Sequence, residues 1–191
     1  MALSAVEIID YVKKYADQAH GEQVRKYTGE RYIVHPVRVM ESARLYTNEL
    51  SAHAAALLHD VLEDTPVTAE EMETSLLEVM SSKDAARTIE LVIELTDIFV
   101  KESYPSLNRR TRKEKEAARL SRISADAQTI KYADIMDNVN DLVGQDTDFA
   151  KVYIRESKKM LKAMESGNRT LRERAIKLVD ACLHSFQPQI P

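Results

Sequence analysis

The feature that most restricts the fold of this chain is its shortage of residues that interrupt regular structure. Four glycines and five prolines occur among 191 residues, which leaves few places for the tight turns that a strand-rich fold requires. No segment alternates β-branched and polar residues between turn signals, as a half-buried strand would. The sequence therefore predicts an all-α bundle of about eight helices, organised as one domain over residues 1–191.

Helix starts are marked by capping boxes, in which a Ser or Thr and a Glu three residues later satisfy each other's backbone amides. Pro36 fits the first turn of a helix running to about Tyr46, because its missing amide is not needed there. Ser51 is expected to cap the next helix. The capping boxes are Ser4–Glu7, Thr68–Glu71 and Thr170–Glu173, and further helices are expected near 84–98, 107–123, 126–143 and 147–166, the last ended by Gly167.

Charge and cysteine content limit the partners. The net charge is -4, so the chain as a whole does not attract nucleic acid or anionic lipid. No stretch is apolar for long enough to cross a bilayer. Cys182 is the one cysteine, which excludes an internal disulfide and fits a cytoplasmic protein. We therefore expect a small-molecule ligand, with neither nucleic acid nor a membrane as partner.

An adjacent histidine and aspartate, His59-Asp60, close the apolar run 54–58. Burying an imidazole and a carboxylate at the end of an apolar helix is costly unless they are paired or bind a metal. His35 lies upstream and Asp134 lies on a later helix. These four residues predict a divalent metal site with about two coordination positions left open. Mixed nitrogen and oxygen ligands favour Mn²⁺, Fe²⁺ or Zn²⁺ over Ca²⁺.

Two further acids, Glu63 and Asp64, follow the His-Asp pair by one helical turn. A carboxylate beside a metal can position or deprotonate a water molecule, or protonate a leaving oxygen. Two acids before Thr65-Pro66 would also suit a solvent-exposed turn. Their closeness to His59-Asp60 favours the catalytic interpretation.

Cations are needed beside such a site if the substrate carries phosphate, because its negative charge must be offset. On the later helix, a lysine three residues before Asp134 and an asparagine four residues after it share its face. The basic run 109–113 is an equal candidate for substrate contact and for a solvated helix start. The candidate substrate-binding residues are Arg25, Lys26, Lys131, Asn138, Arg109 and Arg112.

With these motifs, the chain resembles the HD-domain metal phosphohydrolases. More closely, it resembles the hydrolase domain of the Rel/SpoT stringent-response enzymes and the small alarmone hydrolases. The combination is more specific than the His-Asp pair alone. It spans about residues 5–145, and C-terminal helices are expected over 147–186. The matching segments are Ala19-His20-Gly21 with Arg25-Lys26, residues 32–36, residues 56–65, residues 94–97, and residues 130–134 with Asn138.

The resemblance implies an all-helical HD-domain bundle and a Mn²⁺-dependent enzyme. The implied reaction is hydrolysis of the 3′-pyrophosphate of ppGpp or pppGpp, giving GDP or GTP and pyrophosphate. It also implies four metal ligands, a pair of acids that activate water, and three residues that contact the substrate. By position these are His35, His59, Asp60 and Asp134 for the metal, Glu63 and Asp64 for the water, and Arg25, Lys26 and Asn138 for the substrate.

Three places depart from this family, and one of them is the segment 107–113, which is denser in basic residues than is common. Tyr132 stands where Leu or Val is common, and Ile135-Met136-Asp137 stands where Lys-Leu-Tyr is common. The added charge of Asp137 either faces solvent or alters the pocket. Two other functions therefore stay open: an HD phosphohydrolase acting on a dNMP, a nucleoside polyphosphate or NADPH, and a nucleotide-binding module without catalysis. Apolar faces near 150–186 would serve a homodimer as well as the core.

Overall fold

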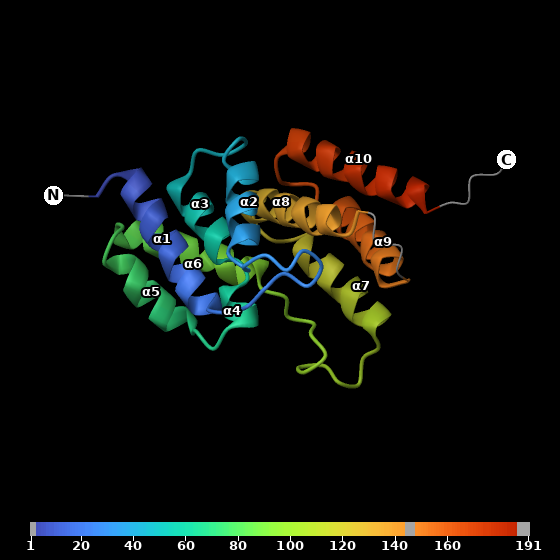
Figure 1. Ribbon diagram of the computed structural model, residues 1–191, viewed down its shortest axis with the longest axis horizontal. Helices are drawn as coiled ribbons and strands as arrows, with labels where there is room; N and C mark the ends of the chain where they lie inside the picture. Colours follow the sequence, from blue (N-terminus) through green and yellow to red (C-terminus); the bar gives the residue numbers. More distant parts are fainter. Residues whose placement is uncertain (1–2, 144–147, 187–191) are drawn as a thin grey trace. The chain divides into compact units, whose positions relative to one another are not determined.

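The computed structural model describes residues 3–143 and 148–186, and all regular structure in these ranges is helical (Figure 1). The all-α prediction is confirmed, with ten helices in the described residues against the eight or so predicted. They are α1 (Ala5–His20), α2 (Val34–Ala43), α3 (Leu50–Leu58), α4 (Val61–Asp64), α5 (Ala69–Leu77), α6 (Ser82–Leu95), α7 (Arg109–Leu120), α8 (Ala125–Asp141), α9 (Asp148–Ala163) and α10 (Arg169–Ser185).

The chain packs as two compact units, Met1–Thr96 and Asp97–Pro191. In the first unit, α3 is the central element and contacts α1, α2 and α6. Residues 54–58 of α3 are fully buried. A helix that is apolar on all sides is stable only when other helices surround it, so α3 forms the core of this unit. The organisation of residues 1–191 as one functional domain stays a prediction.

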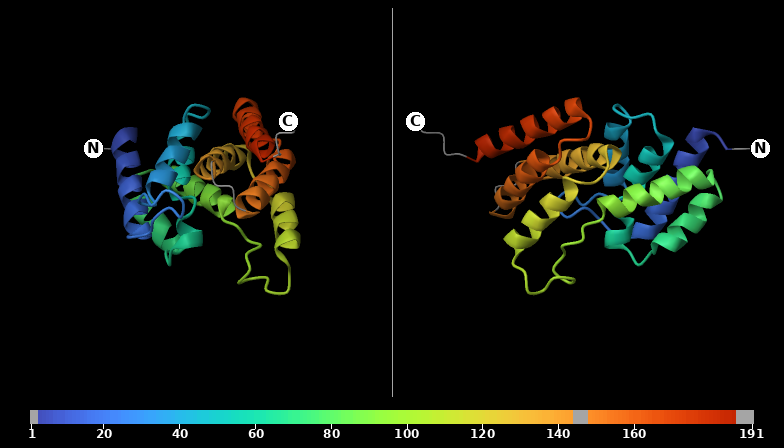
Figure 2. Two further views of the ribbon diagram at one scale, coloured as in Figure 1. Left: turned by 45° about the vertical axis from the view of Figure 1, so that its right-hand side comes forward. Right: turned by 180° about the vertical axis from the view of Figure 1, so that it is seen from behind.

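In the second unit, α10 runs alongside α8 and α9 (Figures 1 and 2). Tyr132 on α8 is fully buried, and its hydroxyl donates to the carbonyl of Met164 at 2.9 Å and to Gln128 Oε1 at 3.2 Å. The same Gln128 oxygen accepts the amide of Ser166 at 2.7 Å. A leucine or valine could not make these hydrogen bonds. Tyr132 therefore has a structural role, because its hydroxyl connects α8 to the segment between α9 and α10.

Two predicted helix caps are wrong. Helix α3 begins at Leu50 with Glu49 as its N-cap, and Ser51 is buried within it. Helix α10 begins after Asn168, whose side chain accepts the amide of Leu171. Asparagine caps a helix as well as threonine does, so the box pattern at Thr170 did not identify the start. The boxes at the starts of α1 and α5 are confirmed.

Other predicted boundaries shift by a few residues. Pro36 lies in the first turn of α2 as expected, but this helix ends at Ala43, not at Tyr46. Helix α9 begins at Asp148, and residue 147 lies outside the described residues. Asp137 is buried, so its charge does not face solvent. Within the described residues, no helix combines the length and the apolar character that a membrane span requires.

Candidate metal centre and active site

His59 and Asp60 occupy the short break between α3 and α4. Asp60 has φ -98 and ψ -6, in the sparsely populated bridge region where many active-site residues lie. Consecutive side chains on a regular helix point about 100° apart. The break turns them toward each other, so that His59 Nε2 lies 3.1 Å from Asp60 Oδ2. His59 and Asp60 thus converge at the end of α3.

The second ring nitrogen of His59 defines its tautomer. His59 Nδ1 lies 2.8 Å from the carbonyl oxygen of Ala56, and because a carbonyl can only accept, Nδ1 carries the proton. In a neutral imidazole the other nitrogen then presents a lone pair. His59 Nε2 and Asp60 Oδ2 are therefore two acceptors that face each other. Such an arrangement is stable only when a cation lies with them, as an added proton or a metal ion.

His35 adds a second imidazole from α2. Its Nε2 lies 3.4 Å from Asp60 Oδ2, and its ring lies edge-on to His59 with 5.1 Å between the centroids. The ligand atoms of the two histidines lie within 4.8 Å of each other, and both side chains are 1% exposed. Two buried imidazoles around one carboxylate oxygen fit a divalent transition metal by ligand type and spacing.

Asp134 lies on α8 in the second unit and is also buried. Lys131 Nζ contacts its Oδ2 at 2.8 Å, and Asn138 Nδ2 donates to its Oδ1 at 2.6 Å. The predicted shared face of these three residues is confirmed. Each carboxylate oxygen is thus held by one neighbour, which fixes the orientation of the group as a hydrogen-bonded partner does for a metal ligand. His35, His59 and Asp134 each offer a buried ligand atom suited to a divalent metal ion.

Tyr32 is a site residue for which the sequence reasoning gave no role. Its hydroxyl donates to Asp60 Oδ2 and to Asp64 Oδ2, both at 2.8 Å. It therefore bridges a predicted metal ligand and a predicted catalytic acid. The ring of Tyr32 stacks on buried His20, with 4.4 Å between the centroids. The sequence signal that could have identified Tyr32 is its position three residues before His35, because the start of α2 places both side chains beside the same carboxylate.

The two aspartates differ in their electrostatics. Burial raises the pKa of the Asp60 carboxyl, but His59 and His35 outweigh burial and hold that pKa well below its usual range. Burial and the charge of Asp60 together raise the pKa of the Asp64 carboxyl. Burial and both aspartates raise the pKa of Tyr32 far above its ordinary value, so it stays a hydrogen-bond donor. Asp60 is thus suited to ligation, and the more basic Asp64 is suited to proton transfer.

The loop between α1 and α2 carries the first two predicted cations. The Arg25 guanidinium lies over the ring of Tyr32, 5.6 Å from its centroid, which places it next to the Tyr32–Asp64 pair. Lys26 instead lies over the ring of Tyr27 at 5.3 Å. Gly29 closes the loop with a φ of 70, where other residues are strained.

The remaining predicted residues have partners of their own. Glu63 is exposed on α4. Arg109 on α7 forms a two-bond ion pair with Glu156 at 2.9 and 2.7 Å and lies over the ring of Phe149. Arg112 donates to the carbonyl of Leu107. Arg109 would have to leave Glu156 before it could contact substrate. Substrate binding by Arg109 and by Arg112 therefore stays a prediction.

Comparison with known proteins adds independent information. The sequence profile of the HD domain family matches residues 32–139. A human guanosine-3′,5′-bis(diphosphate) 3′-pyrophosphohydrolase is 29% identical over 184 residues, covering 91% of this chain and 93% of the relative. An enzyme of the same name from Aquifex aeolicus is 45% identical over 67 residues, or 35% of this chain. The chain spans 10% of the length of the Aquifex enzyme and 19% of a probable Mycoplasma pneumoniae enzyme of that name.

A solved structure has the same fold over nearly the whole chain. It is described as a metazoan orthologue of SpoT that hydrolyses ppGpp and plays a role in starvation responses. Its TM-score is 0.73 at 27% sequence identity, and the match covers 97% of both chains.

Proposed function

We propose that this chain, which belongs to the HD domain family, hydrolyses the 3′-pyrophosphate of guanosine alarmones. The substrates are ppGpp and pppGpp, and the products are GDP or GTP and pyrophosphate. The observation that carries the proposal is the convergence of His35 and His59 on Asp60, with Tyr32 linking Asp60 to Asp64. The names of the human relative and of the metazoan structure support this choice of substrate.

We propose Mn²⁺ as the metal, held by His35, His59, Asp60 and Asp134, with Fe²⁺ and Zn²⁺ as alternatives. The lone pair that neutral His59 presents at Nε2, and the Asp60 oxygen 3.1 Å from it, support this ligand set. When bound, such a metal supplies Lewis-acid chemistry and lowers the pKa of water at the site. Lys131 and Asn138 hold the Asp134 carboxylate in one orientation, which reduces the cost of ordering it on binding.

The side chains of the first unit perform the proton transfers. Asp64, whose pKa is raised, accepts a proton from the attacking water, and Tyr32 fixes the position of its carboxylate. Glu63, in the same turn, is the second member of the acid pair and protonates or orients the leaving group. Arg25 lies over the ring of Tyr32 and offsets the charge of a phosphate or stacks on guanine.

A turnover screen of the purified chain with Mn²⁺ against a nucleotide panel tests the function. We expect pyrophosphate and GDP from ppGpp. Orthophosphate release from a dNMP, another nucleoside polyphosphate or NADPH, with no turnover of ppGpp, would support the alternative phosphohydrolase. Binding of ppGpp without any product, unchanged in a Glu63→Gln variant, would support a binding module. A homodimer and a cytoplasmic location stay predictions.

A further inference from the structure

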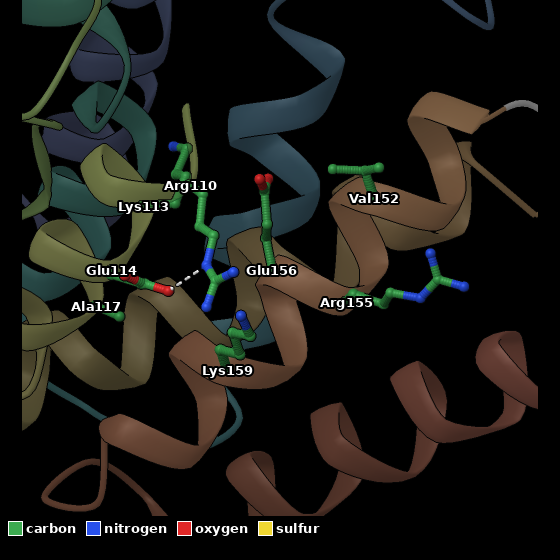
Figure 3. Close-up of a pocket in the computed structure, with 8 residues that line it drawn as sticks. All are labelled: Arg110, Lys113, Glu114, Ala117, Val152, Arg155, Glu156 and Lys159. Carbon is green, nitrogen blue, oxygen red and sulfur yellow. Dashed lines mark hydrogen bonds and ion pairs between the residues drawn. The ribbon is translucent and has the colours of Figure 1, made fainter. Parts of the chain in front are cut away.

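A second site lies entirely within the second unit, in a groove between α7 and α9 (Figure 3). Each helix contributes residues at spacings of three and four, which place them on one face. Helix α7 provides Arg110 and Lys113, and α9 provides Arg155 and Lys159. One glutamate on each helix, Glu114 and Glu156, lies among these cations. The two helices thus face each other with more positive than negative charge.

The carboxylates of the groove are already engaged by arginines. Glu114 accepts from Arg110 at 2.9 Å, and Glu156 is held by Arg109, which does not line the groove. Among residues 3–143 and 148–186, Arg155 and Lys159 have no carboxylate within ion-pair distance. They stand four residues apart on α9, where two like charges destabilise a helix. Lys113 is itself paired with Asp97 at 2.8 Å, so the positive excess that a ligand anion would offset comes from Arg155 and Lys159.

The size and walls of the groove suit a small molecule and not only an inorganic ion. Its volume is about 340 Å³, within the range of small-molecule sites. Ala117 and Val152 supply apolar surface between the charged groups, and the aliphatic parts of the long cationic side chains add to it. Figure 3 shows Arg110 and Glu114 facing Glu156 and Lys159 across the groove, with Arg155 extending along the outer side of α9.

We propose that this groove binds a nucleoside polyphosphate. A polyphosphate concentrates several charges within reach of cations on both helices, whereas the carboxylates of an acidic peptide are spread along its backbone. Arginine matches phosphate oxygens with paired hydrogen bonds. The apolar strip of Ala117 and Val152 accommodates a base. The site uses no residue assigned to the metal centre or to catalysis, so nucleotide binding in the groove can be tested independently of the proposed hydrolysis.

The test is calorimetric titration of the whole chain with GTP, which lacks a 3′-pyrophosphate. EDTA and low ionic strength are used, and the titration is repeated in a His59→Ala background to remove metal-dependent binding. The groove variant is Arg110→Ala/Lys159→Ala. Arg110 is exposed and its pair with Glu114 contributes little to stability, so this variant is expected to fold. We expect at least about a tenfold loss of GTP affinity, because each lost contact is a charge-assisted hydrogen bond.

The chain offers a matched control, Arg169→Ala/Lys162→Ala. Arg169 pairs with Glu173 four residues later, as Arg110 pairs with Glu114, and Lys162 lies on α9 outside the groove. The control removes the same charges and should keep the wild-type affinity. Equal affinity in all three proteins, or an equal loss in both variants, would overturn the proposal. Tighter binding of a polyglutamate peptide than of GTP, lost in the groove variant, would overturn the choice of a nucleotide.

Discussion

Replacing Tyr32 with phenylalanine removes the hydroxyl that joins Asp60, the proposed metal ligand, to Asp64, the proposed catalytic acid. The hydroxyl donates to Asp60 Oδ2 and Asp64 Oδ2 at 2.8 Å each. The ring, and its stacking on His20, would remain. The substitution therefore changes the positions of the two carboxylates while the packing around the ring is kept.

The magnitude follows from the number of hydrogen bonds. A hydroxyl has one proton, so the loss corresponds to about one hydrogen bond to a charged group, or roughly 1.5–3 kcal/mol. The two carboxylates also repel each other more strongly once the shared donor is gone. If the loss falls on the transition state, kcat/KM for ppGpp drops by roughly tenfold to a hundredfold. We expect the decrease mainly in kcat, since Tyr32 positions the acid and does not hold the nucleotide.

The assay is steady-state hydrolysis of ppGpp with Mn²⁺, with Mn²⁺ affinity measured on the same proteins. Tyr27→Phe is the matched control, because Tyr27 lies in the same loop and its hydroxyl makes no hydrogen bond with the described residues. A Tyr32→Phe enzyme with the kcat/KM of the Tyr27→Phe enzyme would refute the bridging role.

His59→Ala should lose metal and activity together, and a metal content near one ion per chain would contradict its assignment as a ligand. Burial raises the pKa of Asp97, but two lysines, Lys113 among them, lower it below its ordinary value. Ionised Asp97 therefore stabilises the fold above the ordinary Asp pKa of about 3.9, and this contribution is lost as the pH falls through the lower folded-state pKa. In Asp97→Asn, urea denaturation should show that the unfolding free energy falls less in that acid range than it does in the wild-type protein. An equal fall in both proteins would exclude Asp97 as a cause of the acid destabilisation. In Gly167→Ala, the new Cβ would lie 2.6 Å from Tyr132 Cε2, which should destabilise the fold by about 1–3 kcal/mol. An increase in melting temperature, as expected for an unconstrained glycine, would contradict the clash.

The helical class and the convergence of His59 with Asp60 could be predicted because their causes are local. The shortage of glycine and proline, the capping boxes of α1 and α5, and the adjacency of His59 and Asp60 are all properties of short segments. The grouping of Lys131, Asp134 and Asn138 follows in the same way from the helical period. Where two local signals competed, as at Asn168 and Thr170, the sequence pattern selected the wrong cap.

The sequence alone determined which residue types stand at helical spacings and which side chains could serve a metal. Only the tertiary structure decided which distant groups meet. Tyr32 reaches Asp64 across 32 residues, and Arg109 reaches Glu156 across 47. A helix repeats every 3.6 residues and thus specifies neighbours three and four positions apart. Contacts across longer separations depend on how helices pack, and this is why the Tyr32 bridge and the α7–α9 groove were not visible in the sequence.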